Sequence, residues 1–227
     1  MTPAREAPLA MAPNYQDDLA YIHDAGFGQL ATSAAGVVVD TLRRGHLTAG
    51  TIVDLGCGGG VLARLVCDAG FAVVGVDLSE ALIAIARARV PEAEFRLGSF
   101  TDVVLPPCVA VTAIGEVFNY AFDPANTVDA RASVFGRVFD ALVPGGLFLF
   151  DMAGPERAPA TGVHRVFSEG EGWAVLMHAA ADESRRRLTR QITTFRRDER
   201  LDPALYRRSH ETHHLHLVDA LDVMTSL

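Results

Sequence analysis

The sequence has 227 residues, of which 49% are hydrophobic and 21% charged, and its formal net charge is −8. The length fits one domain with a substantial apolar core, and the composition excludes a disordered or fibrous chain. No apolar run approaches the ~20 residues of a membrane-spanning helix, and the N-terminus lacks the pattern of a secretory signal. The acidic balance argues against a nucleic-acid partner, because such proteins need a positive field. Three scattered cysteines fit reduced thiols, so we expect a cytoplasmic protein.

Residues 1–48 are predicted to form a helical cap segment ahead of the main fold. After a Pro- and Ala-rich start, the pattern predicts a short helix over Asp17–His23. Apolar residues at helical spacing from Leu30 to Leu42 predict a longer helix, with Gly45 as its C-cap.

Residues 49–155 are predicted to form an α/β core in which strands and helices alternate. The expected strands are Thr51–Leu55, Ala72–Val76, Ala93–Leu97, Val109–Ile114 and Leu147–Met152. The expected helices cover residues 62–69, residues 80–89 with Ser79 as N-cap, and residues 134–142 before Pro144-Gly145-Gly146. Continuously apolar strands are typical of a parallel sheet buried on both faces. The rhythm therefore predicts a Rossmann-like doubly wound sheet, with its ligand site at the carboxyl ends of the strands.

Residues 156–227 have a different texture and are predicted to form an antiparallel β-rich lid or substrate region. Val163–His178, Arg187–Arg197 and Tyr206–Val218 alternate partly between apolar and polar residues, with polar turns between them. A helix is expected to start near Asp219 and run toward Leu227.

A glycine-rich loop, "DLGCGGG" at residues 54–60, joins the first expected strand to a helix. Glycines there permit positive φ and let a ligand approach the backbone, while the first N–H groups of the helix favour negative charge. Asp77 lies 21 residues after Gly56, at the end of the second expected strand. An acidic side chain at that place can accept both hydroxyls of a ribose. Together the loop and the acid predict an adenosine-containing ligand.

A nicotinamide-dependent oxidoreductase is the first alternative for this loop. Its G-x-G-x-x-G pattern would place the third glycine at position 61, where this sequence has Val61. Asp54, two residues before the first glycine, would lie awkwardly near a pyrophosphate but suits a ligand with an ammonium group. The loop thus favours a zwitterionic amino acid over a diphosphate.

These residues resemble the first motif of the class I S-adenosylmethionine-dependent methyltransferases. Three further stretches fit that family: "VVGVDLS" (73–79), "AVTAIGEVFNY" (110–120) and "LVPGGLFLFDMAGP" (142–155). The resemblance covers about residues 50–155 and implies S-adenosyl-L-methionine as the cofactor.

The resemblance also implies roles for individual residues. The methionine end of the cofactor would be surrounded by Asp54, Gly56, Cys57, Gly58 and Gly60, with Asp54 orienting its amino group. Asp77 would bind the ribose hydroxyls, and the adenine would contact Leu78, Ser99 and Phe100. Many relatives have an acid where Ser99 stands. The turn of Gly115, Glu116 and Val117 would face both cofactor and acceptor.

Methyl transfer from a sulfonium is an in-line displacement that needs alignment, exclusion of water and sometimes removal of a proton. Glu116 is the candidate general base, because it follows the fourth strand directly at the ligand edge; the alternative is a carboxylate that hydrogen-bonds the backbone or the cofactor's amino group. Asn119, Tyr120, Tyr21 and His23 are further candidates for the pocket wall.

The histidine-rich stretch "RSHETHHLHL" (208–217) supplies the second catalytic candidate, His213. In a strand, one face would carry Glu211, His213, Leu215 and Leu217, and the other His210, Thr212, His214 and His216. The second face is expected in solvent, whereas the first places Glu211 and His213 where they can point at the acceptor. We expect no metal site.

The expected substrate is a small molecule. The Asn/Asp-Pro-Pro-Tyr signature of amino-methylating nucleic-acid and glutamine enzymes is absent, since "GEVFNY" has no proline. Whether oxygen, nitrogen or carbon accepts the methyl group is left open. A binding module that holds the cofactor without catalysis is the second alternative function.

The family's sheet normally has seven strands and closes with a helix and an antiparallel hairpin. Because the β-rich stretch precedes the last expected helix, we interpret it as an inserted lid and expect the last two strands of the sheet to be missing. Leu147–Met152 would then be an apolar edge, which a lid strand, a second copy of the chain in a homodimer or a further segment must cover.

Overall fold

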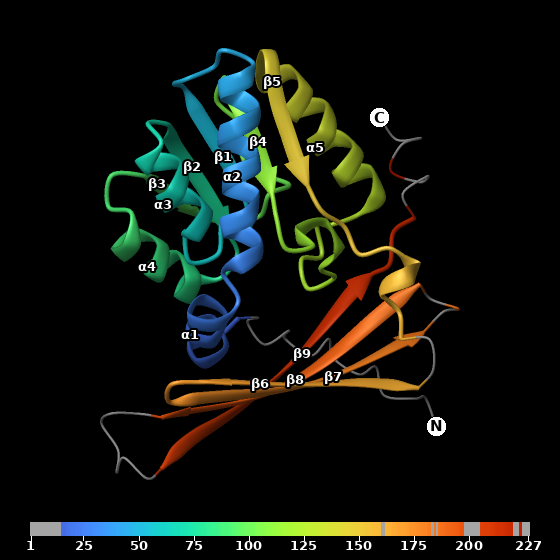
Figure 1. Ribbon diagram of the computed structural model, residues 1–227. Helices are drawn as coiled ribbons and strands as arrows, with labels where there is room; N and C mark the ends of the chain where they lie inside the picture. The colour runs from blue at the N-terminus through green and yellow to red at the C-terminus, as the bar shows by residue number, and fades with distance from the viewer. Residues whose placement is uncertain are drawn as a thin grey trace, which may run out of the picture.

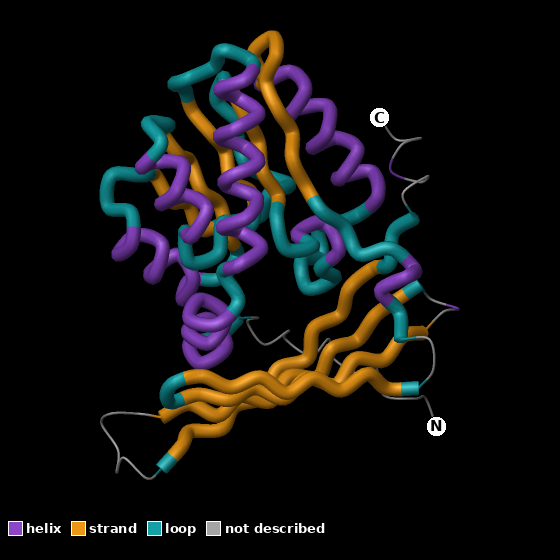
Figure 2. The backbone as a smooth tube through the Cα atoms, in the orientation of Figure 1, coloured by secondary structure: helices purple, strands orange, loops and turns teal. Residues whose placement is uncertain are grey.

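The computed structural model describes residues 15–159, 162–182, 184, 186–197, 205–219 and 223. They form two sheets, with one helix lying between them (Figures 1 and 2). The first sheet contains β1 (Thr51–Leu55), β2 (Ala72–Asp77), β3 (Glu94–Leu97), β4 (Cys108–Ala113) and β5 (Leu142–Phe150). The second contains β6 (Val163–Gly170), β7 (Trp173–Asp182), β8 (Arg187–Arg197) and β9 (Tyr206–His216). The helices are α1 (Asp17–Gly26), α2 (Gln29–Arg44), α3 (Val61–Asp68), α4 (Glu80–Arg89) and α5 (Val128–Ala141), with short 3₁₀ turns at Val117–Asn119 and Pro155–Arg157.

The five-stranded sheet is parallel and has the order β3-β2-β1-β4-β5. Alternate residues of each strand point to opposite faces, and both faces are covered. On one face Ile52 and Ala110 pack against α2, α3 and α4. On the other, Val53 and Val111 pack against α5 and a cluster of phenylalanines. Helices on both faces confirm the predicted doubly wound sheet. Its strands are apolar because both of their faces are buried.

The helices begin and end close to where the sequence predicts. Ser79 accepts a hydrogen bond from the N–H of Leu82 and caps α4 (3.2 Å), and Gly45 is the C-cap of α2. The exception is α5, which was expected over 134–142 but begins at Val128 and ends at Ala141. The fifth strand was expected from Leu147, but β5 begins at Leu142 and includes Pro144-Gly145-Gly146. The strand accommodates them because its register against β4 shifts between Cys108 and Ala110.

The second sheet is an antiparallel meander in the order β6-β7-β8-β9, as the sequence predicts for a lid separate from the parallel sheet. Its inner face packs on α1, where Leu19 and Ile22 contact Trp173, Val175 and Ile192. Charge reinforces this contact, because the buried carboxylate of Asp18 pairs with Arg207 and Arg196, both from the second sheet.

Within the described residues β5 pairs with β4 alone, so it is the edge of the five-stranded sheet, as predicted. The helix predicted from Asp219 falls mostly outside the described residues. None of the described helices combines the length and the apolar character that crossing a membrane requires.

Phe118 joins the ligand edge of the parallel sheet to its core, and its removal should destabilise the fold. Its side chain is fully buried and packs edge-on against Phe100, Phe135 and Phe150. We expect Phe118→Ala to lower the free energy of unfolding by about 3–5 kcal/mol, because it leaves a cavity in a packed core. Urea denaturation measures this change. The matched control is Phe139→Ala on α5, where the side chain is 81% exposed and a change below about 0.5 kcal/mol is expected. Equal losses in both variants would contradict the packing described.

Candidate functional site

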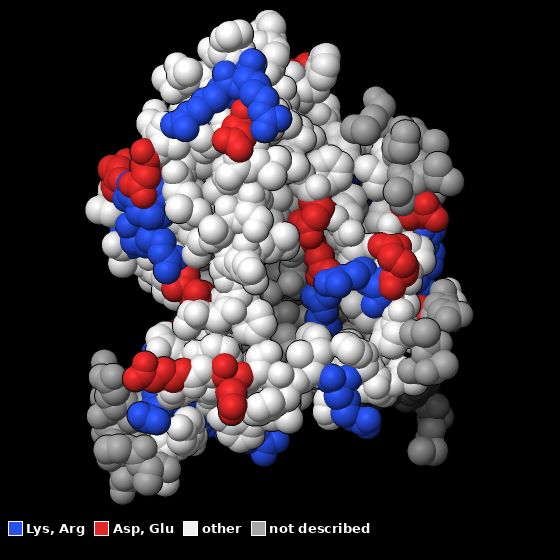
Figure 3. Space-filling view, viewed as in Figure 1, with Lys and Arg blue, Asp and Glu red and all other residues white. Residues whose placement is uncertain are grey.

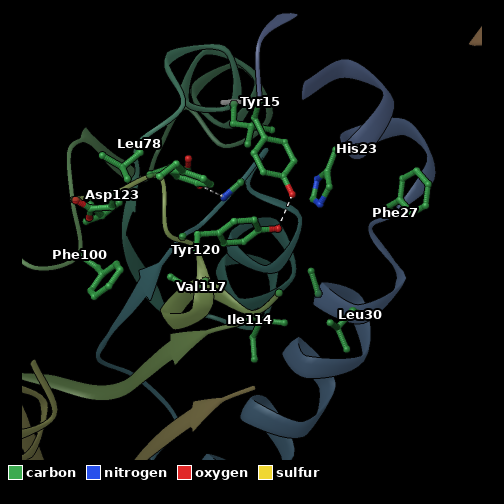
Figure 4. Close-up of a pocket in the computed structure, with 18 of the residues that line it drawn as sticks. Tyr15, His23, Phe27, Leu30, Leu78, Phe100, Ile114, Val117, Tyr120 and Asp123 are labelled. Carbon is green, nitrogen blue, oxygen red and sulfur yellow. Dashed lines mark hydrogen bonds between the residues drawn. The ribbon is translucent and has the colours of Figure 1, made fainter. Parts of the chain in front are cut away.

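A pocket lies at the carboxyl ends of β1, β2 and β4, between the parallel sheet and α1 (Figure 4). Its floor comes from Gly56 and Gly58 of the glycine loop and from Asp77 at the end of β2, and its roof comes from Tyr15 and His23 of the N-terminal segment. The remaining wall includes Phe27, Leu30, Leu78, Phe100, Ile114, Gly115, Val117, Tyr120, Phe122 and Asp123. On the face shown in Figure 3, a hollow lies between the parallel-sheet domain and the second sheet. Acidic and basic side chains lie side by side at its rim.

The glycine loop turns sharply because three of its residues adopt positive φ. Gly56 and Cys57 donate their N–H groups to the carbonyl of Val76 (2.7 and 3.0 Å), which ties the loop to the end of β2. A side chain at Gly56 would collide with Val117, and one at Gly60 would press on Ala86 of α4. A side chain at Gly58 (φ 53°) would meet no protein atom within 4 Å. Gly58 therefore leaves its open side to the pocket.

Asp77 ends β2 and accepts two backbone hydrogen bonds, from Gly58 to Oδ2 (2.9 Å) and from Ser79 to Oδ1 (2.8 Å). Burial raises its pKa, although these N–H donors oppose the shift. A carboxylate has about four lone-pair sites, so Asp77 keeps accepting capacity for ligand hydroxyls.

Asp54 is buried below the loop and is not part of the pocket wall. Thr112 Oγ1 donates a hydrogen bond to its Oδ1 (2.6 Å). Burial raises the pKa of Asp54 to about 7, despite that hydrogen bond. Cys57 is also buried beside the wall, and burial raises the pKa of its thiol well above the usual range. The thiol is therefore no nucleophile.

The side of the pocket that Figure 4 labels Leu78, Phe100 and Asp123 is where an apolar ring can lie. Leu78 follows β2 directly and is 42% exposed, so its side chain is open to the pocket. Ser99 lies behind this wall, where its hydroxyl donates to Asp123 (2.5 Å). Sequence reasoning missed Asp123, because it follows Phe122 in a loop without a periodic pattern.

Glu116 is in the left-handed conformation (φ 62°) and lies in a double ion pair. Arg190 Nη1 of β8 donates to its Oε2 (2.6 Å), and Arg157 Nη2 donates to Oε1 (2.9 Å). The turn itself is fixed, because Gly115 and Glu116 donate their N–H groups to Asp151. Burial alone would raise the pKa of Glu116, but the two arginines outweigh it and lower that pKa. Glu116 thus lies outside the pocket wall and joins the two sheets.

The roof brings together two tyrosines from distant parts of the chain. The hydroxyls of Tyr15 and Tyr120 are 2.8 Å apart, and both rings contact His213. Burial raises the pKa of both tyrosines, and it raises that of Tyr15 well above 10. Tyr15 was missed in the sequence, because it precedes α1 in a stretch without periodicity.

The predicted inner face of β9 is confirmed, because Glu211, His213 and Leu215 are buried. On the face expected in solvent His210 and Thr212 are exposed, whereas His214 and His216 are half-buried. His213 is 1% exposed and lies behind the tyrosines rather than in the pocket wall. No cluster of metal-ligating side chains occurs in the described part of the chain.

Of the further candidates for the wall, His23 and Tyr120 line the pocket. Tyr21 instead stacks under Arg196, with the guanidinium carbon 3.8 Å from the ring centroid. The amide of Asn119 is buried and joins Ala153 to His216.

Comparison with known proteins gives a consistent result. Residues 52–146 match a family model described as a methyltransferase domain. The trans-aconitate 2-methyltransferase of Delftia acidovorans is 33% identical over 120 residues, which are 52% of this chain and 42% of that enzyme. The chain spans about half the length of the curated relatives it matches.

Two solved structures share the fold. A S-adenosylmethionine-dependent methyltransferase from Clostridium acetobutylicum aligns with a TM-score of 0.75 at 18% identity, over 92% of this chain and 84% of that one. The amino pentose methyltransferase CalS10 from Micromonospora echinaspora, solved with S-adenosylmethionine bound, aligns with a TM-score of 0.72 at 22% identity, over 95% and 89% of the two chains.

The buried Asp54 should make the stability of the protein depend on pH. Its folded pKa near 7 exceeds the usual 3.8, so the folded state binds the proton more tightly and stability falls as pH rises from about 4 to about 7. Asparagine can still accept from Thr112 and carries no charge. We therefore expect Asp54→Asn to be more stable than the wild type at pH 8, by about 2–4 kcal/mol, and by less at pH 5.

Urea denaturation at both pH values measures this difference. Asp40→Asn on the exposed face of α2 is the matched control and should change neither value. An Asp54→Asn variant with the same pH dependence as the wild type would contradict the raised pKa.

Proposed function

We propose that the chain is a class I S-adenosylmethionine-dependent methyltransferase, and that it transfers the methyl group of this cofactor to a small-molecule acceptor; the methyltransferase-domain match over residues 52–146 and the similar enzymes support this. The observation that carries the proposal is the pocket in which the open side of Gly58 and the carboxylate of Asp77 meet. When bound, the cofactor supplies an electrophilic methyl group on a sulfonium.

The pocket suits this cofactor better than a dinucleotide. Its described lining contains Asp77 and Asp123 but neither arginine nor lysine. Burial lowers the pKa of His23, so this histidine adds no positive charge. Such a lining fits a positively charged sulfonium and disfavours a pyrophosphate. This lining therefore supports the methyltransferase, and it lacks the basic side chains that would favour the pyrophosphate of NAD(P) in an oxidoreductase.

Each predicted cofactor residue has a proposed task in this arrangement. The spare lone pairs of Asp77 bind the ribose hydroxyls, and Leu78 and Phe100 hold the adenine. Gly56, Gly58 and Gly115 let the ligand approach the backbone. Asp54 orients the amino group of the cofactor from below the loop, while Cys57, Gly60 and Ser99 support the pocket from behind.

Catalysis in this site rests on alignment and exclusion of water rather than on a strong base. Glu116 is held by Arg157 and Arg190 with a lowered pKa, so we assign it to positioning the second sheet against the pocket. The hydroxyls of Tyr15 and Tyr120 keep their protons because of their raised pKa values. They can orient an acceptor by hydrogen bonds, and an in-line displacement gains most from such alignment.

A small acceptor agrees with the charge and with the relatives. A net charge of −8 disfavours nucleic acid, and the related enzymes named above act on aconitate and on an amino pentose. The three free thiols support a reducing compartment such as the cytoplasm.

Asp77 should dominate cofactor affinity. We expect Asp77→Ala to weaken binding of S-adenosylhomocysteine by about 2–4 kcal/mol, because two charge-assisted hydrogen bonds are lost. Isothermal titration calorimetry measures the affinity, and Asp40→Ala serves as an exposed control. An unchanged affinity for Asp77→Ala would overturn this assignment.

Turnover tests the proposal directly. The wild type, given S-adenosylmethionine and a panel of small amines, hydroxyl compounds and carboxylic acids, should release S-adenosylhomocysteine. Gly58→Val should abolish both binding and release, because a branched side chain occupies the open side of the loop. The matched control is Gly70→Val: its φ is also positive and its surroundings are equally open, but it lies outside the pocket. Cofactor binding without release over the whole panel would favour a module without catalysis.

A further inference from the structure

The hydrogen bonds of the Glu211 side chain, in β9, are with the backbone of Tyr15 and Gln16 and with the side chain of His213. Its Oε2 accepts the N–H of Tyr15 (2.7 Å), and its Oε1 accepts the N–H of Gln16 (2.9 Å). His213 Nε2 lies 2.9 Å from Oε2. The side chain of Glu211 is 5% exposed. A carboxylate of the second sheet thus meets a backbone segment 196 residues away in sequence.

Tyr15 is held at every polar group that it has. Its N–H is bound by Glu211, its carbonyl accepts from Ser79 Oγ (2.8 Å), and its hydroxyl meets that of Tyr120. Its φ is 51°, the left-handed region that bulky residues rarely adopt. A backbone in that region persists only when its surroundings impose it. Glu211 and Ser79 supply that constraint on the two sides of the residue.

Because Glu211 is buried, the hydrogen bonding of its carboxylate depends on the position of Tyr15. A buried carboxylate needs hydrogen-bond donors, and leaving it without them is costly. Two of its three partners are the N–H groups of Tyr15 and Gln16. Movement of this segment away from the pocket would leave the carboxylate with His213 alone. The closed position of Tyr15 is therefore favoured by the carboxylate itself.

His213 supports the same arrangement from behind. Its ring centroid lies 4.9 Å from that of Tyr15 and 5.9 Å from that of Tyr120. The ring holds Glu211 and backs both tyrosines, but it does not reach the pocket wall. His213 therefore affects the pocket through Glu211, Tyr15 and Tyr120 rather than by touching a ligand.

We propose that Glu211 is a positioning residue of the methyl-transfer site. It holds Tyr15 over the cofactor pocket, so one carboxylate of the second sheet sets how tightly the parallel-sheet domain encloses its ligand. The inference rests on the proposed function, and it concerns affinity and enclosure rather than the chemical step.

A double-mutant cycle on the full chain separates this role from a general effect on stability. Affinity for S-adenosylhomocysteine is measured by calorimetry for the wild type, Glu211→Gln, Tyr15→Ala and the double variant. Glutamine has one acceptor oxygen, and its NH₂ group must face a backbone N–H donor. We expect Glu211→Gln to weaken binding about tenfold in the wild-type background and less than twofold in the Tyr15→Ala background. Glu169→Gln, an exposed carboxylate of β6, is the matched control and should leave affinity unchanged.

Three results would overturn the inference: an unchanged affinity for Glu211→Gln, an equal loss in both backgrounds, or an equal loss in Glu169→Gln. Should Glu211→Gln fail to fold, Glu211→Asp replaces it in the cycle, because aspartate keeps the charge and is too short to reach both N–H groups. Failure of the wild type to bind S-adenosylhomocysteine would instead refute the proposed function. The two failures are thus distinguishable.

Discussion

The ion pair between Glu116 and Arg190 joins the two sheets, and the arrangement of the site depends on it. Glu116 comes from the turn after β4, and Arg190 comes from the inner face of β8. Both side chains are largely buried, so each needs the other, because a buried charge without a partner is costly. At α1 the buried carboxylate of Asp18 pairs with Arg207, whose side chain is partly exposed. Two ion pairs, each with a buried carboxylate, thereby fix the second sheet and α1, and these elements carry the roof of the pocket.

Much of the parallel domain follows from local sequence, because its strands are apolar and its turns use glycine for steric reasons. The cap at Ser79, the acid at Asp77 and the faces of β9 all depend on residues a few positions apart. The roof could not be predicted in this way. Tyr15, Tyr120 and Glu211 meet only in the folded chain. Arg190 was likewise not among the predicted site residues, although it lies in the strand expected over Arg187–Arg197. Its contact with Glu116 requires the relative position of two sheets, which no periodic pattern contains.

The protonation states around the pocket agree with a site that works by alignment. Burial keeps the hydroxyl protons on both roof tyrosines, while the arginines keep Glu116 ionised and occupied. Asp54, below the glycine loop, is held near the middle of its titration at neutral pH. A carboxylate in that state is stabilised by a positively charged partner. The amino group of the proposed cofactor would be such a partner, which links ligand affinity to the same buried charge that destabilises the free protein.

The contact between Glu211 and Tyr15 also has a consequence for how the protein is made. A ribosome synthesises Tyr15 early, but the carboxylate that anchors it comes 196 residues later. At ordinary rates of about 5–20 residues per second, the two are separated by roughly 10–40 s of translation. During that interval the parallel domain can emerge and fold while Tyr15 has only its hydrogen bonds with Ser79 and Tyr120. A nascent chain therefore lacks the contact between Glu211 and Tyr15 until β9 has left the exit tunnel.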